Sequence, residues 1–197
     1  MRLLLASRNP GKLVELQRML SAAGGVTVVG LNDVPEFPEA PETGATFAEN
    51  ALAKGRDAVA ATGLPAVADD SGLAVDALNG MPGVLSARWA GRHGDDVANL
   101  ELLLAQLGDV PDERRGAAFV CAAALVLPDG TEIVEHGVWP GRIVRAPRGS
   151  GGFGYDPIFV PDGEQRTSAE LSPQEKDAAS HRGRALRALL PHLSGVR

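Results

Sequence analysis

Short apolar runs alternate with segments of helical spacing along this chain, and glycine or proline stands at many of the breaks between them. Residues 2–6 and 66–68 have the composition of buried strands, whereas residues 13–20 repeat leucine and methionine at the spacing of one helix face. Two further apolar segments predict a hairpin over residues 117–138, because a Pro-Asp-Gly turn separates them. Helices and hairpins thus occur in mixed order, which predicts an α/β or α+β fold with a sheet of mixed direction.

Capping signals locate the expected helices. Residues 46–49 and 172–175 each have the capping-box pattern, in which Ser or Thr is followed three residues later by Glu. The first box predicts a helix that ends at Gly63. Further helices are expected over residues 95–107 and from Ser180 onward. Short additional strands are expected at residues 26–29, 73–78, 84–89, 139–144 and 155–160.

Length and composition bound the fold. With 197 residues, of which 44% are hydrophobic and 22% charged, the chain is expected to form one domain over residues 1–197 with its own core. No apolar run approaches the roughly 20 residues that cross a bilayer, so we expect no membrane segment. Residues 1–6 are too short for a secretory signal. Cys121 is the only cysteine, which excludes an intramolecular disulfide and fits a packed thiol in a reducing cytoplasm.

The charge balance restricts the partners. A formal net charge of −6 argues against a protein that binds nucleic-acid phosphates, because such proteins usually carry a basic stripe. An anionic small molecule would have to be held by a few local cations against an unfavourable overall field.

The segment Ser7-Arg8-Asn9-Pro10-Gly11-Lys12 follows the first expected strand and opens the first expected helix. Free backbone amides at the positive end of a helix dipole form an anion site, and Lys12 adds a full charge to it. Ser7 and Asn9 supply short hydrogen-bonding side chains. An ordinary helix cap with a solvated lysine would have the same composition. The segment is not a P-loop, because it lacks the leading glycine and a Ser or Thr after the lysine.

Two adjacent carboxylates, Asp69 and Asp70, come at the expected end of the strand 66–68 and are followed by Ser71 and Gly72. Such a pair is costly unless something binds it, and Mg²⁺ prefers one or two carboxylates together with substrate phosphate oxygens. A carboxylate beside a metal can also orient or deprotonate a water. The alternative is a strand-end turn, since Asp, Ser and Gly are all turn residues.

Other candidate charges lie near the first capping box. Glu42 stands in an acidic, proline-rich loop, and Lys54 lies roughly two turns into the following helix. Glu36 and Glu39 share that loop, so spacing does not select one metal ligand. Each of these groups is also typical of a solvated surface.

The glycine-rich loop of residues 149–154 formally matches the dinucleotide fingerprint GxGxxG. Its context contradicts that function, because the fingerprint should follow a strand and open a helix, whereas this loop leads toward an expected strand. Glycines there would let the backbone approach a ligand closely. Phe153 either packs or stacks on a nucleobase.

Ser180, His181 and Arg182 begin the last expected helix, with Lys176 nearby. Together they gather polar donors near a helix start, although a cap with solvent-facing charges is the ordinary alternative. The remaining histidines have no metal-ligand spacing, and no Gly-x-Ser-x-Gly nucleophile elbow occurs.

Five motifs follow one another along the chain: Ser7-x-Asn9-x-x-Lys12, Glu42-Thr43-Gly44, Ala68-Asp69-Asp70-Ser71-Gly72-Leu73, Gly151-Gly152-Phe153-Gly154-Tyr155-Asp156-Pro157 and Ser180-His181-Arg182. In this order they closely resemble one family, the inosine/xanthosine triphosphate pyrophosphatases. The resemblance runs from the first strand to the final helix. Its most specific parts are the paired aspartates and the Gly-Phe-Gly-Tyr-Asp-Pro block.

The resemblance implies a fold and a reaction. The fold would be α/β, a long twisted mixed sheet flanked by helices, in two lobes around a central cleft. Members are usually homodimers and use Mg²⁺. The implied reaction converts nonstandard purine nucleoside triphosphates, with ITP, dITP and XTP preferred, to the monophosphate and pyrophosphate, which cleans the nucleotide pool.

The resemblance also implies roles for individual residues. Asp70 would be the general base and a metal ligand, with Asp69 and Glu42 beside it and Lys54 assisting with phosphate charge. The segment from Ser7 to Lys12 would hold the triphosphate. The remaining residues would contact the substrate: Ser71 directly, Phe153 by stacking on the base, Gly154, Tyr155 and Asp156 as the lining of its pocket, and Lys176, His181 and Arg182 at the purine edge.

One departure from the family concerns the metal. Many members carry a second acid directly before the Glu-Thr-Gly motif, where this chain has Pro41. We therefore expect the metal to depend on Asp70 and Glu42 together with waters.

The preferred bases have a physical rationale. Hypoxanthine and xanthine offer an acceptor at the 6-position, where adenine offers a donor. Donors such as Arg182 and His181 would favour that acceptor and leave adenine with opposed hydrogens.

Three rival functions follow from the same residues. The GxGxxG match suggests a dinucleotide-dependent oxidoreductase, which NAD(H) binding would test. A module that binds nucleotides without cleaving them needs no second carboxylate facing phosphates, so the paired aspartates argue against it. A related hydrolase acting on modified pyrimidine triphosphates is separated by comparing substrates.

Overall fold

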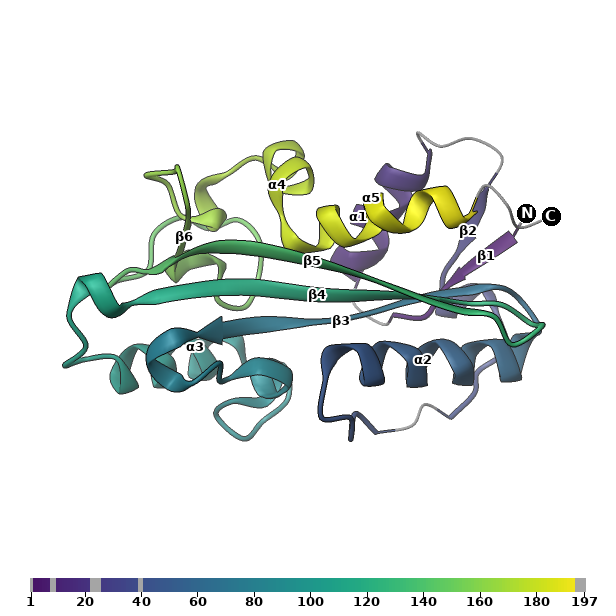
Figure 1. Cartoon of the computed structure of the whole chain (residues 1–197), viewed down its shortest axis with the longest axis horizontal. Coiled ribbons are helices and arrows are strands. Elements are labelled where there is room, and N and C mark those ends of the chain that lie inside the picture. The colour runs from purple at the N-terminus through teal and green to yellow at the C-terminus, as the bar shows by residue number, and fades with distance from the viewer. Residues whose placement is uncertain (1, 8–9, 22–25, 39–40, 194–197) are drawn as a thin grey trace. The chain divides into compact units, whose positions relative to one another are not determined.

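The structure, a computed structural model, describes residues 2–7, 10–21, 26–38 and 41–193. Figure 1 shows the arrangement of its helices and strands. The helices are α1 (Pro10–Ser21), α2 (Phe47–Thr62), α3 (Asp96–Gln106), α4 (Pro173–Ala179) and α5 (His181–Leu193). The strands are β1 (Arg2–Leu5), β2 (Thr27–Val29), β3 (Ala66–Val75), β4 (Gly116–Val126), β5 (Glu132–Ile143) and β6 (Phe159–Pro161).

The strands form one six-stranded sheet in the order β2-β1-β3-β4-β5-β6. Strand β1 pairs in parallel with β2 and with β3, and Leu4 is opposite Ala66 in the second pair. Strands β5 and β6 pair antiparallel, with Gly141 opposite Pro161. The predicted mixed sheet flanked by helices, and with it the α/β class, is confirmed.

The chain forms two compact units. Unit 1 comprises residues 1–70, 121–137 and 182–197, and unit 2 comprises residues 71–120 and 138–181. Strands β3, β4 and β5 each contribute residues to both units. The two expected lobes are therefore present as units, while the cleft and the single-domain assignment stay predictions. Within the described ranges, no helix combines the length and the apolar character that crossing a membrane requires.

Unit 1 buries both faces of its part of the sheet. Successive residues of a strand point to opposite faces, and Leu3 and Leu5 accordingly share a buried cluster with Leu189 of α5. Leu4 belongs instead to a cluster with Ala58 of α2. Figure 1 shows α1 and α5 on one face of the sheet and α2 on the other. Because both faces are covered, these strands read as continuous apolar runs.

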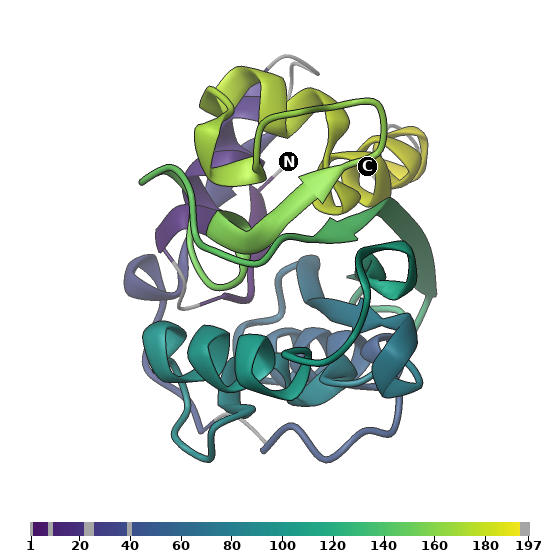
Figure 2. The ribbon, with the colours of Figure 1, turned by 90° about the vertical axis from the view of Figure 1, so that its left-hand side faces the viewer.

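Unit 2 has an aromatic-rich core. Helix α3 lies on one side of the sheet and α4 on the other (Figure 2). The predicted leucine face of α3 is confirmed, since Leu100, Leu103 and Leu107 are buried. The ring centroids of Phe119 and Phe159 lie 4.7 Å apart in an edge-to-face contact, a favoured aromatic geometry.

The helix predictions are confirmed at their capped ends. Thr46 accepts a hydrogen bond from Glu49 N at its side chain, and the Glu49 carboxylate accepts one from Thr46 N. Helix α2 then ends at Gly63, whose left-handed φ of 67° suits glycine. Ser172 and Glu175 form the second box, with Pro173 in the first helical position of α4. The predicted glycine stop after α1 lies outside the described residues.

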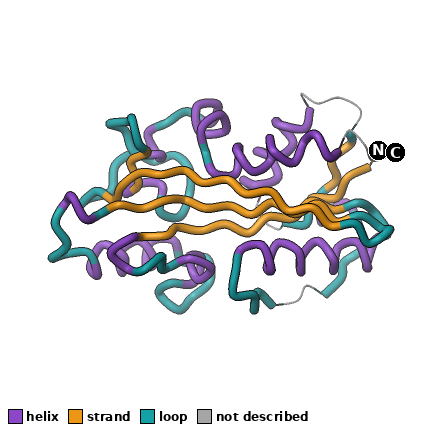
Figure 3. The backbone as a smooth tube through the Cα atoms, viewed as in Figure 1, coloured by secondary structure: helices purple, strands orange, loops and turns teal. Residues whose placement is uncertain are grey.

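Three strand predictions are wrong in extent. Residues 66–68 and 73–78 were expected as separate strands, yet β3 runs unbroken from Ala66 to Val75. The strand expected at residues 139–144 is instead the end of the continuous β5, which runs to Ile143 although Pro140 lies within it. Figure 3 shows both strands without a break. Gly72 serves packing rather than a turn, because a Cβ there would collide with Gly83 O.

Two other segments are helical where strands were predicted. Residues 84–89 fall largely in a 3₁₀ helix, Gly83–Arg88. Ser86 Oγ stabilises it, because it donates to Gly83 O at 2.6 Å and accepts from Leu73 N at 2.9 Å. The first part of residues 155–160 is likewise a 3₁₀ turn, Asp156–Ile158, and only its end forms β6.

Close packing of α2 on β4 generates a stability prediction. A Cβ on Gly55 would lie 2.6 Å from Cγ2 of Val126, well inside the separation of packed carbon atoms. Gly55→Ala should therefore lower the free energy of unfolding by about 1–3 kcal/mol, although alanine is the better helix former. Denaturant unfolding measures this, and Val126→Ala in the same chain should restore part of the loss. A Gly55→Ala protein at least as stable as the wild type would contradict the close approach.

Candidate active site

Asp69 is the buried centre of the first candidate site. Its Oδ2 atom lies 2.8 Å from Lys12 Nζ and 3.2 Å from Arg182 Nε. Lys12 comes from the first turn of α1 and Arg182 from the first turn of α5. Neither first turn contains an acidic residue. Two helix N-termini and two cations therefore converge on one buried carboxylate.

Asp69 stays ionised in this setting. Burial alone would raise the pKa of Asp69, but the charges of Lys12 and Arg182 outweigh it and hold that pKa well below its ordinary value. Cys121 lies on the neighbouring strand, with its Sγ 3.9 Å from the same carboxylate oxygen. Burial raises the pKa of Cys121 to about 12, so the packed thiol expected from the sequence is confirmed.

Asp70, the next residue of β3, meets a different group of side chains. Its Oδ1 lies 3.4 Å from Lys54 Nζ, and the same ammonium forms a short contact with Glu42 Oε1. Because adjacent strand residues face opposite sides of a sheet, Asp70 points toward α2 whereas Asp69 points toward α1 and α5. The pleat therefore gives the two aspartates separate partners.

The pKa shifts of this group follow from burial and charge. Burial raises the pKa of Asp70 above its ordinary value, although Lys54 and a hydrogen bond from Asn50 oppose the rise. Burial would lower the pKa of Lys54, but Asp70 and Glu42 outweigh it and raise that pKa. Asp70 is thus a stronger base than an exposed aspartate, beside a fully charged lysine.

Asn50 is a member of this group that sequence reasoning missed. It is buried in α2, and its Nδ2 donates to Asp70 Oδ2 at 3.0 Å. Its Oδ1 accepts from Gly44 N at 2.8 Å. The available signal was its spacing, since Asn50 precedes Lys54 by one helical turn and so shares its helix face.

The predicted phosphate segment surrounds the start of α1. The helix begins at Pro10, in the position where a missing N–H costs nothing. Lys12 lies in the first turn, as expected, and Ser7 comes two residues after Leu5, the last residue of β1. Arg8 and Asn9 lie outside the described residues. The first amides of a helix have no acceptor within the helix, and this general property remains the basis for expecting an anion here.

Unit 2 contains a second candidate site, built around Asp156. Its buried carboxylate accepts hydrogen bonds from Phe153 N at 2.9 Å and from Ser168 Oγ at 2.8 Å. Lys176 Nζ lies 2.6 Å from it and 5.0 Å from the centroid of the Phe153 ring. The Phe153 side chain is 40% exposed. Asp156 therefore fixes the glycine-rich loop, while the Phe153 ring stays available at the surface of this unit. Ser168 was not foreseen from the sequence.

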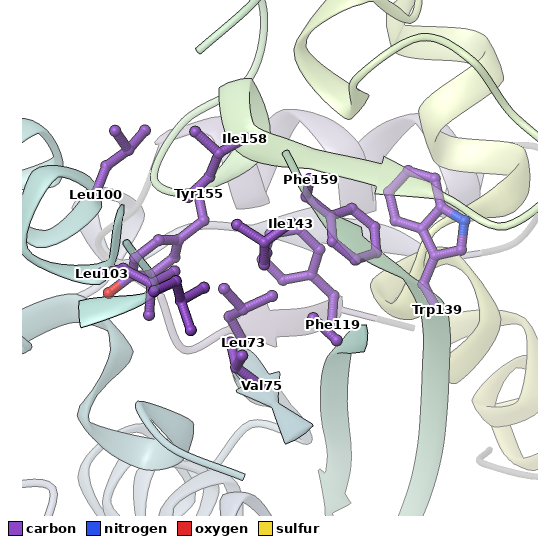
Figure 4. Packing of buried hydrophobic residues seen from close by; sticks show 12 residues of the cluster. Leu73, Val75, Leu100, Leu103, Phe119, Trp139, Ile143, Tyr155, Ile158 and Phe159 are labelled. Carbon is purple, nitrogen blue, oxygen red and sulfur yellow. The ribbon is translucent and has the colours of Figure 1, made fainter. Parts of the chain in front are cut away.

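Other predicted base-pocket residues support this loop. The Tyr155 ring is part of the core (Figure 4), and its hydroxyl donates to Ser86 O at 2.8 Å. Gly154 N donates to Asp96 Oδ2 at 2.9 Å. His181 is buried and stacks on Phe119, with ring centroids 4.9 Å apart. Tyr155 thus anchors the loop to the core, and its ring is buried rather than exposed at the surface.

The predicted residues fall into two groups within the described structure. Unit 1 brings together Lys12, Glu42, Lys54, Asp69, Asp70 and Arg182 through the contacts above. Unit 2 brings together Phe153, Asp156 and Lys176, with Gly154, Tyr155 and His181 in the adjoining loop and core. Ser71 follows Asp70 in β3. Arg182 was expected at the purine edge, and the structure places it in an ion pair with Asp69. Its contact with the base stays a prediction.

The donor set is compatible with a hard divalent cation. Glu42 and Asp70 both contact the ammonium of Lys54, so their carboxylates converge on one positive group. Among residues 2–7, 10–21, 26–38 and 41–193, no cluster of three or more His, Cys, Asp or Glu side chains could hold a metal. Two carboxylates completed by substrate phosphate oxygens are a coordination that suits Mg²⁺.

Fold and site together define an α/β protein with a lysine at the start of its first helix and a buried acid pair on the central strand of its sheet. The Ham1 family model matches residues 3–192. The chain belongs to this family, and the resemblance seen in the five motifs is confirmed.

Individual similar proteins support the same family assignment. The dITP/XTP pyrophosphatase of Nocardia farcinica is 72% identical over 197 residues, covering 99% of this chain and 96% of the relative. A crystal structure of the nucleoside-triphosphatase, or dITP/XTP pyrophosphatase, of Mycobacterium abscessus is 68% identical, with a TM-score of 0.80, and covers 97% of this chain and 100% of that one. A HAM1 protein from Coxiella burnetii is 45% identical with a TM-score of 0.88 and covers 100% of both chains.

The two aspartates should respond oppositely to the loss of charge. Asp69→Asn should lower the free energy of unfolding at pH 7 by about 3 kcal/mol or more, because it removes the carboxylate that faces the buried Arg182. Asp70→Asn should raise it, since the folded-state pKa of Asp70 is raised and ionisation of this group therefore costs stability at neutral pH. Chemical denaturation at pH 7 measures both.

Their pH dependences differ in sign. The lowered pKa of Asp69 makes its contribution to stability present above the unfolded pKa near 3.9 and lost as the pH falls below it. The raised pKa of Asp70 makes wild-type stability fall as the pH rises from about 3.9 through that pKa. The advantage of Asp70→Asn should therefore vanish at low pH. Equal losses in the two variants at pH 7 would contradict this assignment.

Proposed function

We propose that this protein hydrolyses nonstandard purine nucleoside triphosphates, namely ITP, dITP and XTP, to the monophosphate and pyrophosphate and so cleans the nucleotide pool. Membership of the Ham1 family and relatives named dITP/XTP pyrophosphatase support it. The observation that carries the proposal is the pair of contacts on β3: Asp69 binds Lys12 at the start of α1, and Asp70 lies next to it against Lys54.

Unit 1 supplies the phosphate and catalytic groups. The amides at the start of α1 and the charge of Lys12 suit the triphosphate, and Ser7, Arg8 and Asn9 of the same segment are proposed to bind it as well. Lys12 is held by Asp69, so it is positioned before the substrate arrives and costs little reorganisation. We assign Ser71 a contact with the substrate from its place after Asp70 in β3.

We propose Mg²⁺ as the cofactor, held by Glu42 and Asp70. When bound, it would neutralise phosphate charge in the transition state. Lys54, already in contact with both carboxylates, remains charged because its pKa is raised. It can therefore assist with the negative charge of the triphosphate.

Asp70 performs the proton transfer in this proposal. It accepts a proton from a water molecule, whose oxygen forms a bond to the α-phosphorus. The bond from that phosphorus to the bridging oxygen breaks, and pyrophosphate leaves with the bonding electron pair. Lys12 stabilises the charge that develops on the leaving group. The raised pKa of Asp70 suits it as the base.

Unit 2 supplies base recognition. The exposed ring of Phe153, on a loop anchored through Asp156, is suited to stacking on a purine. Lys176 and His181 would supply donors to the 6-oxo group of hypoxanthine or xanthine, where adenine has a donor of its own. Homodimer formation and a cytoplasmic location stay predictions from the resemblance.

The reaction is tested by product analysis. Purified protein with Mg²⁺ should release pyrophosphate from ITP, dITP and XTP much faster than from ATP or modified pyrimidine triphosphates, because only the first three combine a purine with a 6-oxo acceptor and no 2-amino group. Activity should disappear with EDTA and return with Mg²⁺. Release of single phosphate, or fastest turnover of a modified pyrimidine, would reject the reaction as stated.

Asp70→Asn serves as the matched control for that assay. It should retain nucleotide binding and fold at least as well as the wild type, yet lose most turnover, on the order of 100-fold or more, because the base is absent. An Asp70→Asn enzyme with unimpaired turnover would overturn its assigned role.

Stacking by Phe153 is tested separately. Phe153→Ala should raise the KM for ITP by about 5- to 160-fold, the range that corresponds to about 1–3 kcal/mol for one stacked base. Because the ring is exposed, the unfolding temperature should hardly change. Phe153→Trp should keep a KM near that of the wild type, and an unchanged KM in Phe153→Ala would exclude stacking on this ring.

A further inference from the structure

A buried amide that the proposed chemistry does not use lies beside the catalytic carboxylate. Asn50 is only 2% exposed. It donates from Nδ2 to Asp70 Oδ2 at 3.0 Å and accepts at Oδ1 from Gly44 N at 2.8 Å. Both polar ends of the side chain are therefore engaged, one with a catalytic group and one with the loop that follows Glu42.

The contacts on Asp70 come from one helix face and hold both of its oxygens. Asn50 binds Oδ2, and Lys54, one turn later on α2, binds Oδ1. Two donors on a rigid helix restrict rotation of the carboxylate about its Cβ–Cγ bond. Lys54 is a flexible point charge, whereas the planar amide of Asn50 has a fixed direction, so Asn50 determines the orientation.

The other end of Asn50 connects to the metal-ligand loop. A Cβ on Gly44 would lie 2.6 Å from Asn50 Oδ1, so the loop backbone approaches this amide more closely than another residue would allow. The start of α2 is fixed independently, because Glu49 Oε2 accepts from Ala45 N at 2.6 Å and Thr46 N at 3.2 Å. Asn50 thus links a rigid helix start to Glu42, two residues before Gly44.

We propose that Asn50 is a positioning residue that orients the carboxylate of Asp70 and holds the Glu42-Thr43-Gly44 loop beside it. Asparagine suits both contacts, because one amide can donate to a carboxylate and accept from a backbone N–H without adding charge. Its effect on turnover rests on the proposed function, whereas its effect on the orientation of Asp70 does not.

Two substitutions separate the contacts. Asn50→Asp keeps an acceptor for Gly44 N but cannot donate to Asp70, and Asn50→Ala removes both. Each variant should lower kcat for pyrophosphate release from ITP by about 10- to 100-fold, the loss typical of a misplaced catalytic group, while KM changes less than about threefold. Kinetics corrected for the folded fraction give the split between kcat and KM.

Asn99 provides the control. It is 1% exposed, and its side chain accepts from Ala90 N at 2.7 Å and donates to Ala87 O at 3.1 Å, so it is a similarly buried amide in unit 2. Asn99→Ala should lower the unfolding temperature about as much as Asn50→Ala but leave kcat within about twofold. An equal kcat loss in both alanine variants, or a kcat for Asn50→Asp within twofold of the wild type, would overturn the proposal.

A crystal structure of Asn50→Ala tests the proposal without turnover. The carboxylate of Asp70 should rotate away from its wild-type orientation, and Gly44 should shift. An unchanged Asp70 would refute positioning even if the enzyme were slow. If the wild-type protein released no pyrophosphate from any triphosphate, the proposed function would fail, and this structure would still decide the role of Asn50.

Discussion

The ion pairs of Asp69 are the interaction on which the site depends. This buried carboxylate joins Lys12 of α1 and Arg182 of α5, which are separated by most of the sequence, to the central strand β3. Each cation lies at a positive helix end, where the dipole disfavours it. The carboxylate offsets both cations, so each of them has a buried counter-charge. A chain with a net charge of −6 thereby holds two cations close together at the starts of two helices.

The pleat of β3 gives two neighbouring aspartates different chemistry. Asp69 faces two cations, and its pKa is lowered, so it is a permanent anion with a structural task. Asp70 faces α2, where burial outweighs Lys54 and Asn50, and its pKa is raised. Two carboxylates on successive residues of the strand have different surroundings, because successive side chains point to opposite faces of the sheet. Different helices cover those two faces.

In unit 2, a buried carboxylate holds a loop in place. This loop depends on a buried aspartate, Asp156, whose carboxylate collects a backbone amide, a hydroxyl and the ammonium of Lys176. Phe119 and Phe159 pack edge to face in the core of unit 2, and Tyr155 of the loop belongs to the same buried cluster. The outcome is an exposed ring at Phe153 on a backbone that is held in place, which is what a stacking platform requires.

Local signals in the sequence predicted most helices correctly, because a capping box or a leucine face is complete within a few residues, as at Thr46–Glu49 and along α3. The motifs named the other residues that gather in unit 1 but grouped Arg182 with the purine-edge residues rather than with Asp69. They missed Asn50, whose importance depends on Asp70 twenty positions later. The uninterrupted course of β3 through Asp69-Asp70-Ser71-Gly72 was missed, since turn-forming residues stay extended only when distant partners neutralise the carboxylates.

The sequence by itself determined the capped ends of α2 and α4, the apolar runs of the sheet and the chemical groups available for phosphate and base. Only the tertiary structure decided which aspartate meets Lys12 and Arg182, which meets Lys54 and Asn50, and that Arg182 contacts Asp69. The physical reason is that charge pairing and burial act between residues far apart in the chain, and their strength depends on distances that local patterns do not contain.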